Sequence, residues 1–207
     1  VEANTPSRFN ADPRRLYESS GCAGKLAVFA VRVNTHPMVK KEASFYVATN
    51  RPKDLYELRR LLLTQLDELP EVGEYMHRDI FDVAEKYGKD TFLSVLYLGT
   101  QRLPKLFALK GRFDAFCNKK TWLPKYLSDK VMQFFGRMFP THLPDRLLAF
   151  RNEYEHHLVI KLSDDEISKG RQILNDYFAE STTGVYIECT NDEAKRAYLH
   201  RWIASNG

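Results

Sequence analysis

The sequence predicts an α+β fold, in which a split β-α-β antiparallel sheet has helices on one face and carries a helical, basic insertion. The first supporting observation is that strand, helix and strand patterns follow one another twice, near residues 43–98 and near residues 156–189. The second is that the segment between them, residues 99–153, contains four prolines and an excess of basic residues. Two halves of one sheet are therefore expected to flank the insertion.

Apolar runs mark the first half of the sheet. Residues 25–33 and 43–49 are rich in β-branched and aromatic side chains, so each is predicted to form a strand. A helix is predicted to begin at the capping residue Asn50, with Pro52 in its first turn, and to end at Pro70. Its apolar face recurs at helical spacing and consists of Leu55, Leu58, Leu62, Leu66 and Leu69.

A short helix and a further strand complete this half. Residues 79–87 predict the helix, which ends at Gly88, and the apolar residues 91–98 predict the strand. Within the insertion, the best helix is predicted over residues 127–139, where Ser128 or Asp129 can cap it. The insertion is therefore expected to be partly helical and to differ in kind from the two halves around it.

The second half repeats the alternation of strand and helix. Strands are predicted over residues 156–162 and 184–189. Each is followed by the pattern of a capping box, in which a Ser or Thr and a Glu three residues later satisfy backbone N–H groups at a helix start. The boxes are Ser163 with Glu166 and Thr190 with Glu193, and the second begins a helix that runs through Trp202.

The composition is that of an ordinary globular protein. Hydrophobic residues make up 43% and charged residues 28%, which excludes collagen-like, low-complexity and fully disordered proteins. Three scattered cysteines are too few for a disulfide framework and favour a reducing compartment. No apolar run approaches the ~18 residues of a transmembrane helix, and the first residues lack the pattern of a signal peptide. Because the sequence does not begin with Met, we expect a piece of a longer protein.

Basic residues are concentrated in residues 101–151. This segment contains eleven Lys and Arg but only three Asp, so its net charge is +8 against −4 for the rest of the chain. Such a surface could bind nucleic acid, lie on an anionic bilayer or simply be solvated. The apolar neighbours Phe134, Phe135, Met138 and Phe139 favour lipid over nucleic acid. We expect membrane contacts from Lys105, Lys110, Arg112, Lys119, Lys120, Lys125, Lys130 and Arg137.

Histidines are the main candidates for chemistry, because their usual pKa lies near neutral pH. His156 and His157 are adjacent in a predicted strand, so their side chains point to opposite faces and cannot easily chelate one metal ion. No metal site is expected. His156 shares an apolar face with Leu158 and Ile160 and is expected to be the more packed of the two, while His200 is expected on an exposed helix face. Either member of the pair could be structural, or a general base or substrate ligand.

Four stretches resemble a known family, namely SGCAGKLAVFAVR at residues 20–32, GEYMHRDIFDVAEKYGKD at 73–90, FPTHLP at 139–144 and YEHHL at 154–158. The family is that of the quinone-dependent, respiratory D-lactate dehydrogenases of bacteria. These flavoproteins are similar in architecture to the vanillyl-alcohol-oxidase class. The resemblance runs the whole length of the chain. It implies oxidation of D-lactate to pyruvate by hydride transfer to FAD, with electrons passed to a membrane quinone.

The resemblance also implies a division of the chain. Residues 1–34 would be the end of the FAD-binding domain, 35–98 the first half of a cap domain, 99–153 a membrane-binding insertion and 154–207 the second half of the cap. The sequence has no glycine-rich phosphate loop, so FAD would be bound mainly by an absent domain.

Site roles and location follow from the same resemblance. Val28 would contact the cofactor, and His157, with His156 beside it, would be catalytic. The implied partners are D-lactate, quinone and an anionic membrane surface, without nucleic acid. The implied location is the cytoplasmic face of the bacterial inner membrane, as a peripheral protein. The alternative is a non-catalytic basic module that binds anionic lipid or nucleic acid.

Overall fold

The computed structural model describes residues 27–30, 38–120, 127–136, 138 and 141–206. The chain falls into two units, Val1–Val39 and Lys40–Gly207. In the first unit, residues 27–30 are exposed and belong to no helix or strand. The other residues of the strand predicted over 25–33 lie outside the described residues, so the four that are described do not bear that prediction out.

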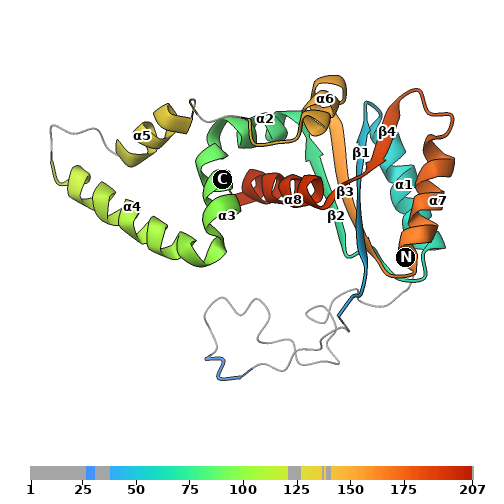
Figure 1. Cartoon of the computed structure of the whole chain (residues 1–207), viewed down its shortest axis with the longest axis horizontal. Coiled ribbons are helices and arrows are strands. Elements are labelled where there is room, and N and C mark those ends of the chain that lie inside the picture. Colours follow the sequence, from blue (N-terminus) through green and yellow to red (C-terminus); the bar gives the residue numbers. More distant parts are fainter. Residues whose placement is uncertain (1–26, 31–37, 121–126, 137, 139–140, 207) are drawn as a thin grey trace. The chain divides into compact units, whose positions relative to one another are not determined.

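A four-stranded antiparallel sheet forms the centre of the unit Lys40–Gly207 (Figure 1). Its strands are β1 (Glu42–Thr49), β2 (Val72–His77), β3 (His156–Ser163) and β4 (Gly184–Glu188), in the spatial order β2-β3-β1-β4. One helix connects β1 to β2 and another connects β3 to β4, which is the split β-α-β arrangement. The α+β fold class is confirmed, and three strands lie within one residue of their predicted bounds.

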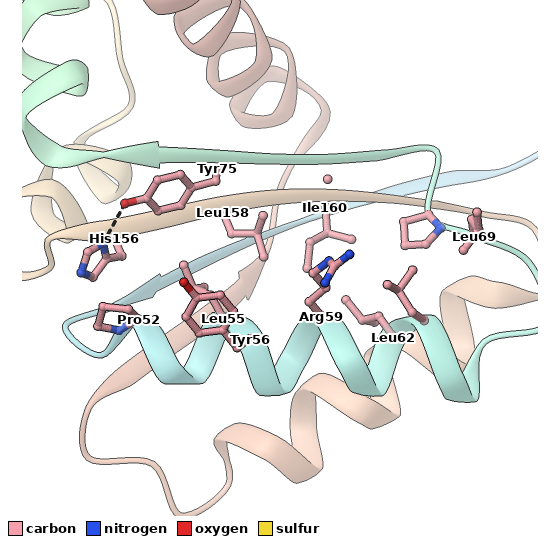
Figure 2. A pocket seen from close by; sticks show the side chains of 13 residues that line it. Pro52, Leu55, Tyr56, Arg59, Leu62, Leu69, Tyr75, His156, Leu158 and Ile160 are labelled. Carbon is pink, nitrogen blue, oxygen red and sulfur yellow. Dashed lines mark hydrogen bonds between the residues drawn. The ribbon is translucent and has the colours of Figure 1, made fainter. Parts of the chain in front are cut away.

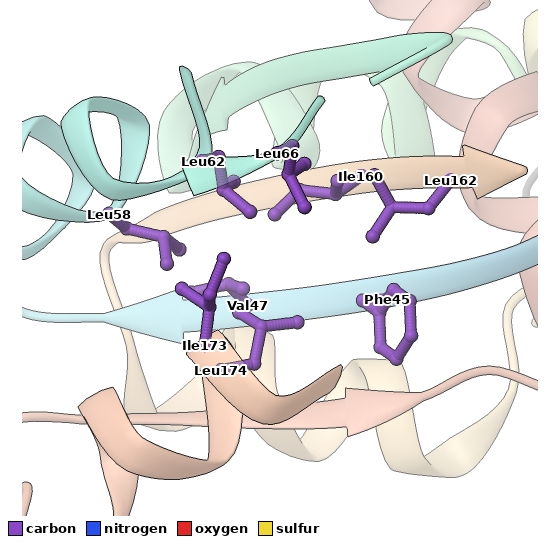
Figure 3. Close-up of a cluster of buried hydrophobic side chains, with 9 residues drawn as sticks. All are labelled: Phe45, Val47, Leu58, Leu62, Leu66, Ile160, Leu162, Ile173 and Leu174. Carbon is purple, nitrogen blue, oxygen red and sulfur yellow. The ribbon is translucent and has the colours of Figure 1, made fainter. Parts of the chain in front are cut away.

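Helices α1 (Pro52–Gln65) and α7 (Glu166–Phe178) cover one face of this sheet. Alternate residues of β1 and β3 point to the same face of a sheet, and here they meet the apolar faces of both helices (Figure 3). The buried core consists of Phe45, Val47, Leu58, Leu62, Leu66, Ile160, Leu162, Ile173 and Leu174. Gly170 allows α7 to approach the sheet closely, because a Cβ there would clash with Cδ1 of Leu162.

The opposite face of the sheet is covered as well. Tyr46, Ala48 and Val159 form a buried cluster with Leu147 of α6 (Asp145–Glu153) and Ala197 of α8 (Asn191–Asn206). The sequence predicts helices on one face only. Helices α1 and α7 form that layer, and α6 and α8 add a second one (Figure 1). As a consequence, the last six residues of β1 are all buried.

The segment between β2 and β3 is helical. Its described elements are α2 (Arg78–Tyr87), α3 (Lys89–Leu98), the 3-10 turn η2 (Thr100–Arg102), α4 (Leu103–Asn118), α5 (Leu127–Gly136) and α6. Helix α3 contacts α8 as well as α4 and α5. Helix α4 is absent from the prediction because Pro104 resembles a helix breaker. It lies in the first turn of α4, where its missing N–H removes no helical hydrogen bond.

Helix α5 corresponds to the helix predicted over residues 127–139, although residue 139 lies outside the described residues. The first turn of α5 is stabilised by a carboxylate from a different helix. Asp114 of α4 accepts hydrogen bonds from the backbone N–H of Ser128, at 3.1 Å, and from the hydroxyl of Ser128. Asp114 therefore links α4 to α5.

The strand predicted over residues 91–98 is wrong, because these residues belong to α3. The run is apolar throughout, and such a run does not distinguish a strand from a buried helix. In the helix, Phe92, Leu93 and Leu96 contribute to a second core that also contains Phe81 and Ile203. The strand that completes the first half of the sheet is β2, which is absent from the prediction.

The two predicted capping boxes have different outcomes. At the start of α8, the backbone N–H of Glu193 donates to Thr190 Oγ1 at 3.3 Å, and the N–H of Thr190 donates to Glu193 Oε2 at 2.8 Å. This box is confirmed. The box at Ser163 is wrong, because Ser163 ends β3 and the carboxylate of Glu166 accepts instead from the N–H of Asp67 at 3.2 Å.

Helix α1 differs from its prediction at both ends. Its N-cap is Arg51. The amide of Asn50 donates to the carbonyl of Glu153 at 3.1 Å and accepts from the N–H of Glu155 at 3.0 Å. At the other end α1 stops at Gln65, so Leu66 and Leu69 lie beyond the helix and only Leu66 is buried. Asn50 thus ties the end of the insertion to the start of α1.

Candidate functional site

A groove between α1 and the strands β2 and β3 is the first candidate site (Figure 2). Its volume of about 570 Å³ lies within the range of small-molecule sites. Its floor is apolar, with Leu62 from α1 and Leu158 and Ile160 from β3. Its polar side chains are Tyr56 and Arg59 from α1, Tyr75 from β2 and His156 from β3.

His156 is the titratable imidazole of this groove. One of its ring nitrogens, Nδ1, lies 2.9 Å from the hydroxyl of Tyr75 (Figure 2). Its ring centroid lies 5.3 Å from that of His77. Partial burial, together with repulsion from His77, lowers the pKa of His156 below its usual value. His156 is therefore a neutral base at neutral pH.

Arg59 supplies a positive charge to the groove. Within the part of the chain that the structure describes, its guanidinium has no ion pair. A guanidinium binds a carboxylate through two parallel hydrogen bonds. Tyr56, Arg59 and Tyr75 are absent from the sequence prediction because they lie on separate elements and because β2 was not predicted. The spacing of Tyr56 and Arg59, one helical turn apart, is the signal that could have indicated a shared face.

His157 lies on the other face of the sheet. Only 1% of its surface is exposed, and its ring packs 5.7 Å from the rings of both Tyr46 and Phe81. Neither ring nitrogen has a hydrogen-bond partner among the described residues. Burial lowers the pKa of His157 to about 4. The two histidines point to opposite faces as predicted, but the expectation that His156 is the more packed one is wrong.

Two further histidines are buried where α8 meets the insertion. Nδ1 of His200 lies 3.3 Å from Nε2 of His142, and Nε2 of His200 lies 3.1 Å from the carbonyl of Phe81. The exposed position expected for His200 is therefore wrong. Burial lowers the pKa of His142 to about 3 and that of His200 to about 4. Across the described ranges, no group of three or more His, Cys, Asp or Glu side chains is placed to hold a metal ion.

The basic segment presents a mixed cationic and apolar surface on α4. Five residues recur at alternating spacings of four and three, which places them on one face of the helix. All five are exposed, with exposed fractions of 66% for Leu109 and 61% for Phe116. We call this face the membrane stripe; it consists of Lys105, Leu109, Arg112, Phe116 and Lys119.

The other residues predicted to bind a membrane are placed differently. Lys120 and Lys130 are exposed, and Lys110 is partly buried. Lys125 and Arg137 lie outside the described residues. Of the apolar group, Phe134 and Met138 are exposed, whereas Phe139 lies outside the described residues. No helix in the described parts is both long enough and apolar enough to cross a bilayer.

Val28 belongs to the first unit, where 48% of its surface is exposed. An exposed apolar side chain of this kind can pack against a flat ring. It supplies no group that binds phosphate, and the sequence has no glycine-rich phosphate loop. Val28 therefore stays a predicted cofactor contact that fits only the ring portion of a flavin nucleotide.

The known proteins and the family model to which this chain is similar have names that agree with one another. A family model described as "D-lactate dehydrogenase, membrane binding" matches residues 44–207. The quinone-dependent D-lactate dehydrogenase of Escherichia coli (strain K12) is 50% identical over 205 residues, which are 99% of this chain and 36% of that protein. The protein of the same name from Haemophilus influenzae is 49% identical over 206 residues, 100% of this chain and 36% of the relative.

A third such dehydrogenase, from Corynebacterium glutamicum, is 39% identical over 203 residues, 98% of this chain and 36% of the relative. The similarity thus covers nearly the whole chain in all three cases. The chain spans 36% of the length of these curated relatives.

Proposed function

Because this chain belongs to the membrane-binding D-lactate dehydrogenase family, we propose that it forms the cap and the membrane-binding region of a quinone-dependent D-lactate dehydrogenase. The whole enzyme oxidises D-lactate to pyruvate and passes the electrons to a quinone. Bound FAD would supply the hydride acceptor, and it would be held mainly by residues outside this chain, with Val28 as a contact. The alternative is a basic module without catalysis, and it does not account for the groove around His156.

The membrane stripe is the main observation in favour of this function. A Lys or Arg near an anionic bilayer contributes about 1 kcal/mol of binding free energy, and the stripe has three such residues, Lys105, Arg112 and Lys119. Leu109 and Phe116 lie between them and add an apolar contribution that salt does not remove. We infer a peripheral protein held at the anionic, cytoplasmic surface of the inner membrane.

The groove is the part of this chain that we assign to D-lactate. Arg59 binds the substrate carboxylate in this proposal, because its guanidinium is the cation of the groove. His156 takes the hydroxyl proton. In the tautomer whose Nδ1–H donates to the Tyr75 oxygen, Nε2 has the free lone pair. His157 was the first candidate from the resemblance. Its burial favours a positioning role behind the sheet, through packing against Tyr46 and Phe81.

Charge reversal on the stripe tests the membrane part of the proposal. In the whole enzyme, Lys105→Glu, Arg112→Glu and Lys119→Glu together should weaken binding to anionic vesicles by about 100-fold or more, since three cations contribute about 3 kcal/mol. Co-sedimentation at low and high salt measures this. A matched control reverses Lys53, Arg60 and Lys195, which are exposed in the sheet region, and changes the net charge equally.

The control triple should retain vesicle binding within a few-fold. Equal losses in both triples would mean that net charge alone decides, and the stripe would have no special role. If single-stranded nucleic acid of equal charge displaced the vesicles from the protein, the alternative of a basic module would be favoured instead.

A further inference from the structure

A second cavity, of about 460 Å³, lies in the insertion where α3, α4 and α5 meet. Its walls are formed mainly by apolar side chains of α4. Polar groups from all three helices also reach it. The lining residues are Asp90, Thr91, Ser94, Leu103, Leu106, Phe107, Leu109, Lys110, Phe113 and Ser128.

This cavity is adjacent to the membrane stripe. Leu109 belongs to both, and Leu106, Lys110 and Phe113 lie on the neighbouring side of α4 when successive residues are placed 100° apart around the helix axis. The cavity lining therefore borders the surface that we assign to the bilayer. A molecule dissolved in the lipid would then lie beside the cavity.

A hydrogen-bonded contact between two helices lies beside the cavity at Ser128. Asp114 accepts hydrogen bonds from the backbone and the hydroxyl of Ser128, so α4 and α5 are held together beside it. Phe107 and Phe113 add aromatic surface, about half of which is exposed in each. The hydrogen bonds of Asp114 therefore join α4 to α5 at this cavity, and the two phenylalanines supply apolar wall.

The polar groups of the lining include hydrogen-bond donors beside the carboxylate of Asp90, which accepts from the backbone N–H and, at 3.5 Å, from the hydroxyl of Thr91. The hydroxyl of Ser94, on α3, can donate to a carbonyl oxygen, and the ammonium of Lys110, on α4, has three N–H groups, so it can donate to a ligand in addition to its contact within the protein. An acyl chain has no polar atom that would use them. A quinone ring is flat, stacks on aromatic side chains and has two carbonyl oxygens that accept hydrogen bonds, and its tail is apolar.

We propose that this cavity binds the ring of the membrane quinone. The inference rests on the proposed function, since it identifies where the electron acceptor of that reaction meets this chain. The volume lies in the range of 300–1,000 Å³ typical of small-molecule sites. The ring lies between Phe107 and Phe113, its carbonyl oxygens accept from Ser94 and Lys110, and its tail runs along Leu109 toward the lipid.

The test uses the whole enzyme, a short-chain quinone and two variants of the lining. Ser94→Leu fills the cavity and removes a donor, and Phe113→Ala removes an aromatic wall. Both should raise the KM for the quinone about tenfold or more. The KM for D-lactate, reduction of a water-soluble dye and vesicle binding should stay unchanged. Tyr97→Ala is the matched control, because Tyr97 is an exposed aromatic residue of α3 that belongs to neither the cavity lining nor the membrane stripe.

A second measurement does not depend on turnover. A photoreactive azidoquinone, irradiated with the unmodified enzyme in vesicles, should label peptides of α3 and α4, and Ser94→Leu should reduce this labelling. Labelling elsewhere, or an unchanged quinone KM in both folded variants, would overturn the proposal. So would variants that change vesicle binding alone, because the cavity would then hold a lipid chain.

The two proposals fail in different ways. An unmodified, flavin-loaded enzyme that does not reduce the dye with D-lactate would contradict the proposed function. The labelling would still decide whether the cavity takes a quinone.

Discussion

The β-sheet and helix α4 place similar apolar side chains in opposite environments. In β1, the last six residues are buried between α1 and α7 on one face and α6 and α8 on the other. In α4, five large apolar side chains are more than a third exposed, namely Leu106, Phe107, Leu109, Phe113 and Phe116. The sheet is stabilised by its own core, whereas α4 exposes an apolar surface that a second surface must cover.

Buried histidines lie between α8, which packs on the sheet, and the helices α2 and α3, which precede α4 in the chain. His200 of α8 contacts His142, which precedes α6, and the carbonyl of Phe81 in α2. The ring of Phe92 in α3 packs against that of His142 in a tilted arrangement, with ring centroids 4.1 Å apart. This joint is polar although it is buried, so it depends on the protonation state of its imidazoles. One chain can thus combine a region that is stabilised by its own core with a region that exposes a binding surface, if the contact between them is separately stabilised.

Acid should break this joint, and this is the largest effect that we expect. In the folded protein the pKa is about 3 for His142 and about 4 for His157 and His200, below the ordinary value of about 6.5. The unfolded chain therefore binds more protons between these values. Stability is complete above pH ~6.5 and falls toward pH 4, by up to about 1.4 kcal/mol per pH unit for each histidine.

Urea unfolding at pH 7, 6 and 5 measures this dependence. His200→Gln should reduce the slope by about one proton, because one imidazole no longer titrates. The charged neighbours Lys89 and Arg196 near His142, and Asp82 near His200, are unchanged in this variant. A free energy of unfolding that is constant from pH 7 to pH 5 would contradict the buried, neutral state of the three imidazoles.

Substitution in the groove should separate catalysis from membrane binding. In the whole enzyme, His156→Ala should reduce turnover of D-lactate with a dye by about 100-fold, the effect of losing a general base. Binding to vesicles and bound flavin should stay unchanged. His157→Phe, which keeps an aromatic ring in the buried position, is the comparison and should keep turnover within a few-fold. A larger loss in His157→Phe than in His156→Ala would return the catalytic role to His157.

Helix caps should show the smallest effect and the clearest contrast. Removal of a capping side chain costs about 1 kcal/mol. Thr190→Ala removes a cap from α8, which packs on the sheet, so global stability should fall by about this amount. Asp114→Ala removes a similar contact from α5 and should only increase local opening of that helix. Hydrogen exchange distinguishes global destabilisation from local opening of α5. Equal loss of amide protection throughout the protein in both variants would show that the sheet and α5 unfold as one cooperative unit.

Much of the sheet could be predicted from the sequence, because its strands are local patterns. Residues of β1, β3 and β4 form short apolar or alternating runs, and their bounds are predicted to within one residue. The second capping box is equally local. The strand β2 is absent from the prediction because Gly73 and Glu74 interrupt the run of apolar residues. The residues of α3 are predicted as a strand because a uniformly apolar run shows neither the periodicity of a helix nor that of a strand.

The candidate site was predicted only in part, because its residues are brought together by the fold. The charge of the insertion is visible in the sequence, so most of the membrane stripe was predicted. Arg59 and Tyr75 come from elements whose contact depends on the position of β2. His200 has its partner His142 at a separation of 58 residues. No pattern near either residue indicates the other.

The order of strands in the sheet has a consequence for synthesis. β1 pairs with β3 and β4, and never with β2, which follows it in the chain. During N-to-C translation, β1 therefore leaves the ribosome without a partner, and the whole segment from α2 to α6 emerges before β3 does. The helices with the exposed cations and phenylalanines are thus made first. A nascent chain can settle on the bilayer before its sheet has closed.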